Sequence, residues 1–215
     1  MIYAIRDSQK ITATPGQTAE CPCCNTEVIS KCGDINIWHW AHKAKENACI
    51  YKDETNWHRE MKSLFDPDMV EIRVENQNGV AIADVLLPDG TAIEFQHSAI
   101  DIDTIQRRKL IHKKIIWVFD LSPQFDRDQI KSYTIFGKQK LKYRRPKKIL
   151  RRIYPKLLYL YLGRNLFYKP DDFPENTFIE NEDTGYNERY FYFTGKLINK
   201  EQFISSLNIF QNSPF

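Results

Sequence analysis

The sequence has no long apolar run: none of its 215 residues lies in a stretch approaching the roughly 18 apolar residues that a transmembrane helix needs. Its first residues, Met-Ile-Tyr-Ala-Ile-Arg-Asp, lack an apolar segment followed by a small-residue cleavage site, so secretion is not expected. Disorder is not expected either, because 13 Phe, 11 Tyr and 4 Trp supply ample material for a core. We therefore expect a cytoplasmic globular protein with no membrane partner.

Acidic residues are absent from one segment of the chain. The 19 residues from Lys138 to Lys156 contain 10 basic residues and no acid. Residues 121–215 carry 17 Lys and Arg against 10 Asp and Glu, whereas residues 1–120 carry 14 against 18. Such a block favours a polyanion partner, since neutralising phosphates releases counterions, although a solvated basic helix face is an alternative. The candidate nucleic-acid contacts here are Arg144, Arg145, Lys147 and Lys148.

Cysteine is also absent from most of the chain, because all five cysteines lie between Cys21 and Cys49. An odd number without a signal segment argues against a disulfide framework. Cys21 and Cys24 form a CxxC pair, and His39 and His42 follow after 14 intervening residues. Two thiolates and two imidazoles complete a tetrahedral zinc shell, so we expect Zn²⁺ at these four residues.

The choice of the four ligands is still open at this point. Cys23, Cys32 and Cys49 could each replace one of them, and Cys32 and Cys49 rank above Cys23. Buried free cysteines with surface histidines are the alternative without a metal. No water-activating carboxylate is obviously placed among these residues, so the zinc is expected to be structural. It would hold together about 35 residues, too few to build a core alone.

Periodicity and turn signals predict the order of elements along the chain. Asn78-Gly79 and Asp89-Gly90 are typical hairpin turns. The expected elements are an extended segment over 2–13, a helix from Thr55 to Phe65, strands at 70–74, 80–87 and 91–97, a helix from Asp103 to Lys114, and a buried strand over 115–119.

The remaining residues are harder to interpret. Basic and aromatic residues alternate over 149–161, a pattern suited to binding single-stranded nucleic acid through Tyr154, Tyr159 and Tyr161. The acidic stretch from Asp171 to Glu188 is expected to be a loop, followed by a strand over 189–193 and a helix over 200–207. The predicted fold class is α/β (α+β), a small mixed sheet flanked by helices. Its expected domains are 1–52 with the zinc, 53–125 as the core, and 126–215 as the basic and aromatic region.

Two carboxylates interrupt the apolar strands of the expected core. Asp84 lies within Ile-Ala-Asp-Val-Leu-Leu, and Glu94 lies within Ala-Ile-Glu-Phe-Gln. Burying such residues costs several kcal/mol unless they are paired or bind a cation, although a solvent-facing side of the strand is the alternative. Glu94 and Gln96 share one face of their strand. Oxygen ligands of this kind suit Mg²⁺ or Mn²⁺, which can activate water against a phosphodiester.

An ordered set of motifs across about residues 1–125 resembles the competence protein CoiA-like family, in which an N-terminal zinc-finger-like module precedes a nuclease core of the PD-(D/E)XK type. The motifs are Cys21-Pro22-Cys23-Cys24, Lys31-Cys32-Gly33, His39-Trp40-Ala41-His42, Trp57-His58-Arg59-Glu60-Met61-Lys62, Ala83-Asp84-Val85, Glu94-Phe95-Gln96-His97-Ser98 and Trp117-Val118-Phe119-Asp120. The resemblance implies a metal-dependent DNA nuclease with a restriction-endonuclease-like core.

The resemblance also implies roles for single residues. Asp84 and Glu94 would bind the catalytic metal, and Gln96 takes the usual lysine position without its positive charge. On the preceding helix His58 ranks slightly ahead of Glu60 as a catalytic residue. The candidate phosphate contacts near these groups are Lys62, Arg107 and Arg108.

Three functions follow as hypotheses. The first is a Mg²⁺- or Mn²⁺-dependent nuclease acting on single- or double-stranded DNA. The second is a zinc-containing nucleic-acid-binding protein whose core no longer cuts. The third is a docking module for other DNA-processing or phage-defence proteins.

Overall fold

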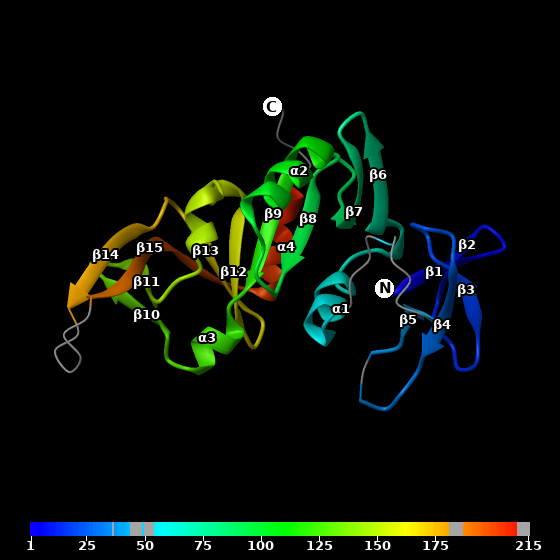
Figure 1. The fold of residues 1–215 in the computed structure, drawn as a ribbon. Helices are drawn as coiled ribbons and strands as arrows, with labels where there is room; N and C mark the ends of the chain where they lie inside the picture. Colours follow the sequence, from blue (N-terminus) through cyan, green and yellow to red (C-terminus); the bar gives the residue numbers. More distant parts are fainter. Residues whose placement is uncertain (36, 44–48, 50–53, 181–186, 210–215) are drawn as a thin grey trace. The chain divides into compact units, whose positions relative to one another are not determined.

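The computed structural model describes residues 1–35, 37–43, 49, 54–180 and 187–209. The chain forms two compact units, whose elements are labelled in Figure 1. The first comprises Met1–Glu94 with Arg107–Lys114, and the second comprises Phe95–Gln106 with Ile115–Phe215. Strand β8 (Ala92–Gln96) and helix α2 (Ile102–His112) each contribute to both units. The expected boundary at residues 52 and 53 lies outside the described residues.

The first unit begins with a five-stranded sheet in the order β2-β1-β3-β4-β5, drawn in blue in Figure 1. Asp7 and Ser8 both have positive φ, as a tight hairpin turn requires, and they join β1 to β2. Small side chains surround Trp40 in the core of this sheet, which explains how so few residues enclose an apolar centre. Its strands are β1 (Tyr3–Arg6), β2 (Gln9–Thr12), β3 (Thr18–Glu20), β4 (Glu27–Lys31) and β5 (His39–His42).

The predicted helix after residue 54 is confirmed as α1 (Asn56–Lys62). Thr55 caps it, because its side-chain oxygen accepts from the backbone N–H of His58 at 3.3 Å. A 3-10 turn, η1 (Pro67–Met69), then leads into the strands of the core.

The predicted hairpins of the core are confirmed as β6 (Val70–Asn76), β7 (Gly79–Leu86) and β8. Asn78 and Gly79 join β6 to β7, and Asp89 and Gly90 lie in the turn before β8. Gly90 has φ +81°, and Asp89 accepts from the Thr91 backbone N–H at 3.0 Å. These local contacts fix the register that brings β7 beside β8.

Helix α2 is also confirmed. The Asp101 carboxylate accepts from the backbone N–H and the hydroxyl of Thr104 at 2.7 and 2.9 Å, so it caps the first turn. Toward the other end, the Asn76 side-chain amide donates to the Ile111 carbonyl at 2.9 Å and so ties the helix to β6.

The second unit is built on a sheet in the order β10-β11-β15-β13-β12-β9, with β14 paired to β15. Phe203 of α4 stacks on Phe167 with ring centroids 4.3 Å apart, so this helix covers an aromatic core. The strands are β9 (Ile115–Asp120), β10 (Ile130–Ile135), β11 (Lys138–Arg144), β12 (Leu158–Gly163), β13 (Leu166–Pro170), β14 (Glu175–Glu180) and β15 (Asn187–Asn199). The helices are α3 (Ser122–Asp126), η2 (Lys148–Arg152), η3 (Pro155–Leu157) and α4 (Lys200–Ile209).

Two expectations for this unit are wrong. The acidic stretch from Asp171 to Glu188 is not only a loop, because β14 pairs there with β15. Tyr159 and Tyr161 do not face nucleic acid: they lie 1% and 8% exposed in β12, which pairs in parallel with β9 inside the sheet. A strand covered on both faces buries its aromatic residues whatever charges flank it in sequence.

The predicted fold class is confirmed as a mixed α+β architecture, mostly sheet with a few helices. In the part of the chain that the structure describes, no helix is both long and apolar enough to cross a membrane. The division into three domains and the restriction-endonuclease-like nature of the core stay predictions.

Candidate functional site

Four residues that the sequence marks as possible metal ligands meet in the first unit. Cys21, Cys24, His42 and Cys49 each place a ligand atom within 4.8 Å of the other three. The Sγ atoms of Cys21 and Cys49 are 3.6 Å apart, and Cys24 Sγ lies 3.3 Å from His42 Nε2. A tetrahedral zinc shell with bonds of about 2.0–2.3 Å has ligand-to-ligand distances of roughly 3.5–3.8 Å. The group therefore fits a metal such as zinc.

The turn after β3 explains how two of these thiols come together. The Asn25 backbone N–H donates to the Cys21 carbonyl at 2.9 Å, and Cys21 N–H donates to the Thr26 carbonyl at 2.9 Å. Asn25 adopts φ +57°, a left-handed conformation that asparagine tolerates well. The chain thus reverses between Cys21 and Cys24 and presents both side chains on one side.

The thiols differ in their electrostatic environment. Burial raises the pKa of the Cys21 thiol. Burial also acts to raise the pKa of Cys24, but hydrogen bonds from Thr26 and His42 outweigh it and lower the value to about 6. A thiolate is the form that binds a metal, so Cys24 is prepared for this role near neutral pH.

The structure brings Cys49 rather than His39 into the metal-binding group. His39 Nδ1 instead lies 2.8 Å from the Ile37 carbonyl oxygen. The spacing of His39 and His42 favours a pair of ligands from one strand, but neighbouring positions of β5 need not point to the same centre. Cys23 and Cys32 pack half-buried near the core of the sheet without joining the group.

The two predicted acids occupy adjacent antiparallel strands. Val85 of β7 pairs with Ile93 of β8, and the same register continued by one residue sets Asp84 opposite Glu94. The side chains of Glu94 and Asp84 are only 1% and 16% exposed. The alternative of a solvent-facing strand side is therefore wrong for these two residues.

Basic and imidazole groups compensate both carboxylates. His58 Nε2 lies 3.6 Å from Asp84 Oδ2, whereas Glu60 is exposed on α1. Glu94 forms an ion pair with Arg108, and its Oε1 lies 3.2 Å from His112 Nε2. The structure thus brings His58, and not Glu60, to the acids.

The charges of this cluster favour an ionised Asp84. Burial alone would raise its pKa, but the hydrogen bond from His58 and the positive charges of Lys62 and Arg108 lower it to about 2. Burial, helped by Arg108, lowers the pKa of His112 to about 4, so this imidazole is neutral at pH 7. The cluster presents carboxylate oxygens, the ligands that Mg²⁺ and Mn²⁺ prefer.

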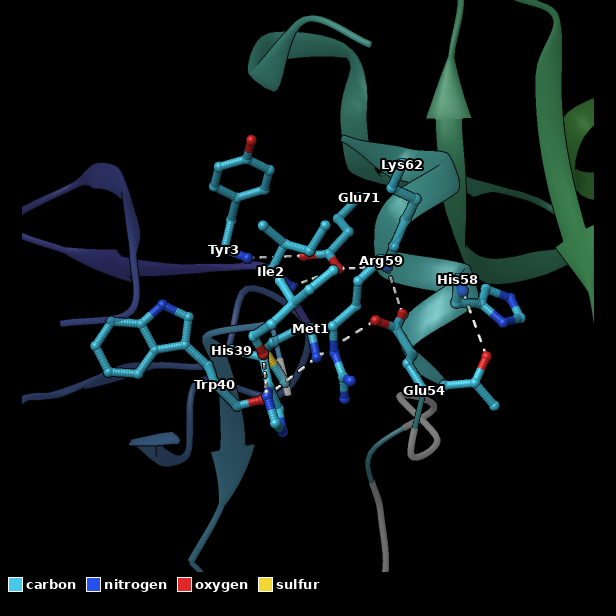
Figure 2. A network of polar contacts seen from close by, with 12 residues as sticks. Met1, Ile2, Tyr3, His39, Trp40, Glu54, His58, Arg59, Lys62 and Glu71 are labelled. Carbon is cyan, nitrogen blue, oxygen red and sulfur yellow. Dashed lines mark hydrogen bonds and ion pairs between the residues drawn. The ribbon is translucent and has the colours of Figure 1, made fainter. Parts of the chain in front are cut away.

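The prediction that Lys62 contacts nucleic acid is wrong, because its side chain is fully buried. Figure 2 shows the network around it. Its ammonium donates to Glu54 at 2.5 Å and to Glu71 at 2.6 Å. The Glu71 carboxylate also accepts from the backbone N–H groups of Ile2 and Tyr3 at 2.8 and 3.1 Å. The network therefore connects β1 to α1 and β6, and the charge of Lys62 helps to lower the pKa of Asp84.

The predicted basic contacts have different surroundings in the structure. Arg107 donates to the Val80 carbonyl at 3.2 Å. Arg144 and Arg145 both pair with Glu188, at 3.9 and 2.9 Å. Lys147 is half-buried and donates to the backbone carbonyls of His97 and Asp120, whereas Lys148 is exposed.

Gln96 belongs to the second unit, where its side-chain amide donates to the Ser98 carbonyl at 2.9 Å. Beside it, His97 Nδ1 lies 2.7 Å from Asp120 Oδ2, and the Ser122 hydroxyl donates to Asp120 at 2.6 Å. The sequence pattern predicts no role for this polar group.

Three further charged or imidazole groups of the site were not predicted. His112 follows Arg108 by four residues on α2, a spacing that puts both on one helix face and could have revealed it. No local pattern marks Glu54 or Glu71, which lie eight and nine residues from Lys62 and outside helix α1.

Taken together, fold and site define a mixed α+β protein whose N-terminal sheet carries a Cys₃His group able to bind a metal such as zinc. Residues 6–51 match the family model described as the N-terminal domain of competence protein CoiA. The N-terminal region of the chain is therefore similar to this domain, and the match does not extend to the rest of the chain. The match includes all four residues of the metal-binding group and ends before Asp84 and Glu94. Comparisons with curated proteins and with solved structures gave no match.

Proposed function

We propose that this protein is a Mg²⁺- or Mn²⁺-dependent DNA nuclease that hydrolyses phosphodiester bonds, with Zn²⁺ as a structural ion at its N-terminal Cys₃His group. One observation carries the proposal. Glu94 is buried and Asp84 mostly buried on adjacent strands, with a register that sets them opposite one another. The hydrogen bond from His58 and the charges of Lys62 and Arg108 keep Asp84 ionised. Burying two acids side by side costs free energy unless positive charge compensates them. A bound divalent cation is a common source of that charge at functional sites.

The roles of the chain's own residues follow from their contacts. Asp84 and Glu94 would hold the ion, which when bound activates water and stabilises charge on the phosphodiester. His58 orients the Asp84 carboxylate and can accept or return a proton beside it. Arg108 offers a guanidinium that can turn from Glu94 to a phosphate oxygen. Gln96, whose amide donates to Ser98, takes the usual place of a lysine by the family resemblance alone.

We propose DNA as the substrate because the motifs of the core resemble those of the CoiA-like family, and that resemblance implies a nuclease acting on DNA. The excess of basic residues after residue 120 favours a polyanion, either single- or double-stranded. We place this activity in the cytoplasm, where other DNA-processing or defence proteins would be its further partners.

A catalytically inactive nucleic-acid-binding protein is the second candidate. Glu94 is already paired with Arg108 and lies beside His112, so its charge is satisfied without a metal. Gln96 cannot supply the positive charge of a lysine. A protein of this kind would keep the zinc and the basic surface and would not cut.

Cleavage assays with matched variants distinguish the two candidates. Labelled single- and double-stranded DNA would be incubated with the zinc-loaded protein and either Mg²⁺ or Mn²⁺. Asp84→Asn and Glu94→Gln should each abolish cleavage and leave the fold intact, because they keep shape and remove the charge that holds the ion. Glu75→Gln is the control, since this acid lies 56% exposed on the neighbouring strand β6. A wild type inert on every substrate with both ions would leave the binding protein as the remaining candidate.

A further inference from the structure

A cavity of about 360 Å³ in the second unit is lined almost entirely by positive charge. Two segments some distance apart in sequence build it: η2 contributes three basic residues, and β15 contributes a fourth together with an aromatic ring. The lining residues are Lys148, Arg151, Arg152, Arg189 and Phe191. No acid lies among them, so the cavity has the chemistry of an anion site.

The three basic residues that η2 contributes to the cavity have no acidic partner in the part of the chain that the structure describes. Within the described ranges, no carboxylate oxygen lies within 4 Å of a side-chain nitrogen of Lys148, Arg151 or Arg152. Glu188, which precedes Arg189 on β15, pairs with Arg144 and Arg145.

The aromatic ring of the cavity, Phe191, contacts Arg151 and offers no exposed face on which a nucleobase could stack. Phe191 is fully buried, and the guanidinium carbon of Arg151 lies 5.9 Å from its ring centroid. This cation–π contact orients Arg151 and covers the ring face. A nucleobase therefore finds no stacking surface here, and the group that the cavity recognises is the anion.

We propose that this cavity binds phosphate groups, and that their source is the backbone of the nucleic acid strand. The proposal deepens the nuclease function and rests on it for the identity of the strand. Arginine forks bind phosphate oxygens through paired hydrogen bonds, and this cavity offers three arginines and a lysine. Its volume lies at the small end of ligand sites, with room for neighbouring phosphates and not for a folded partner. Free pyrophosphate offers the same oxygens and serves as a probe.

The test measures binding without cleavage. The zinc-loaded protein would be titrated with a labelled single-stranded oligonucleotide, and separately with pyrophosphate, with no Mg²⁺ or Mn²⁺ added. The variant Arg151→Gln/Arg152→Gln removes two exposed charges of the cavity. The comparison variant Arg144→Gln/Arg145→Gln removes the same charge from residues that already pair with Glu188.

We expect the cavity variant to weaken the binding of both ligands about tenfold or more, and the comparison variant to weaken it less. The salt dependence of strand binding should fall by about 0.7 log units for each phosphate that the variant no longer neutralises. A weakening confined to pyrophosphate would support the phosphate site and overturn the strand as its source. Equal effects of the two variants on both ligands would overturn the proposal.

The outcome is separable from that of the nuclease proposal. Wild-type protein that binds pyrophosphate in the cavity but never cuts DNA would refute the nuclease and leave the phosphate site intact.

Lys148→Gln provides a second, milder variant of the cavity, and circular dichroism would show that each variant keeps its fold.

Discussion

Replacing Lys62 with methionine should destabilise the first unit strongly, because the change leaves two buried carboxylates without their cation. The Lys62 ammonium lies 2.5 Å from Glu54 and 2.6 Å from Glu71, and these acids are 9% and 1% exposed. Removing one partner of a buried ion pair costs about 3–5 kcal/mol. After the change Glu54 keeps the Met1 ammonium at 3.6 Å, and Glu71 keeps the backbone N–H groups of Ile2 and Tyr3, but neither acid keeps the lysine charge. Methionine keeps the length and apolar volume of the lysine stem, so little of the destabilisation would come from a cavity.

Urea unfolding followed by tryptophan fluorescence measures this effect. Lys43→Met is the matched control, because Lys43 and Glu27 form a surface pair at 3.5 Å with side chains 72% and 55% exposed. An exposed pair contributes about 0–1 kcal/mol, so the control should remain close to the wild type. If Lys62→Met cost no more than Lys43→Met, the network would not stabilise the unit as we describe.

Two further predictions concern the metal-binding group and the acids. Cys49→Ala should release the zinc, whereas His39→Ala should retain it, because Cys49 belongs to the metal-binding group with Cys21 and His39 does not. Metal analysis after dialysis would show this difference, and the reverse pattern would refute the ligand assignment. His58→Ala should lower the cleavage rate about 10²-fold, since Asp84 loses its hydrogen-bond partner and a proton carrier. A rate equal to that of the wild type would remove His58 from the site.

Local signals in the sequence predicted much of the core. Asn78-Gly79 and Asp89-Gly90 fix two turns through their own backbone preferences, so the strands between them and the register of Asp84 with Glu94 could be anticipated. The clustering of cysteines likewise indicated a metal site from the sequence alone. In each case a few neighbouring residues determine the geometry.

The interactions that the sequence could not reveal join residues of different helices and strands. Lys62 looks like an exposed basic residue of a helix until Glu71 is placed beside it by the β6 strand. Similarly, Arg144 and Arg145 look like free phosphate contacts until β15 brings Glu188 to them. Burial and pairing of a charge depend on tertiary structure, and no local pattern encodes them.

The central claim is that Asp84 and Glu94 hold a divalent ion, and binding of Mn²⁺ to the zinc-loaded protein tests it most directly. This measurement does not depend on finding the right DNA substrate. We predict that titration calorimetry will show a Mn²⁺ site in the wild type, that Asp84→Asn and Glu94→Gln will each lose it, and that Glu75→Gln will keep it. A wild type that binds no Mn²⁺ beyond its zinc site, or equal binding in all four proteins, would contradict the claim.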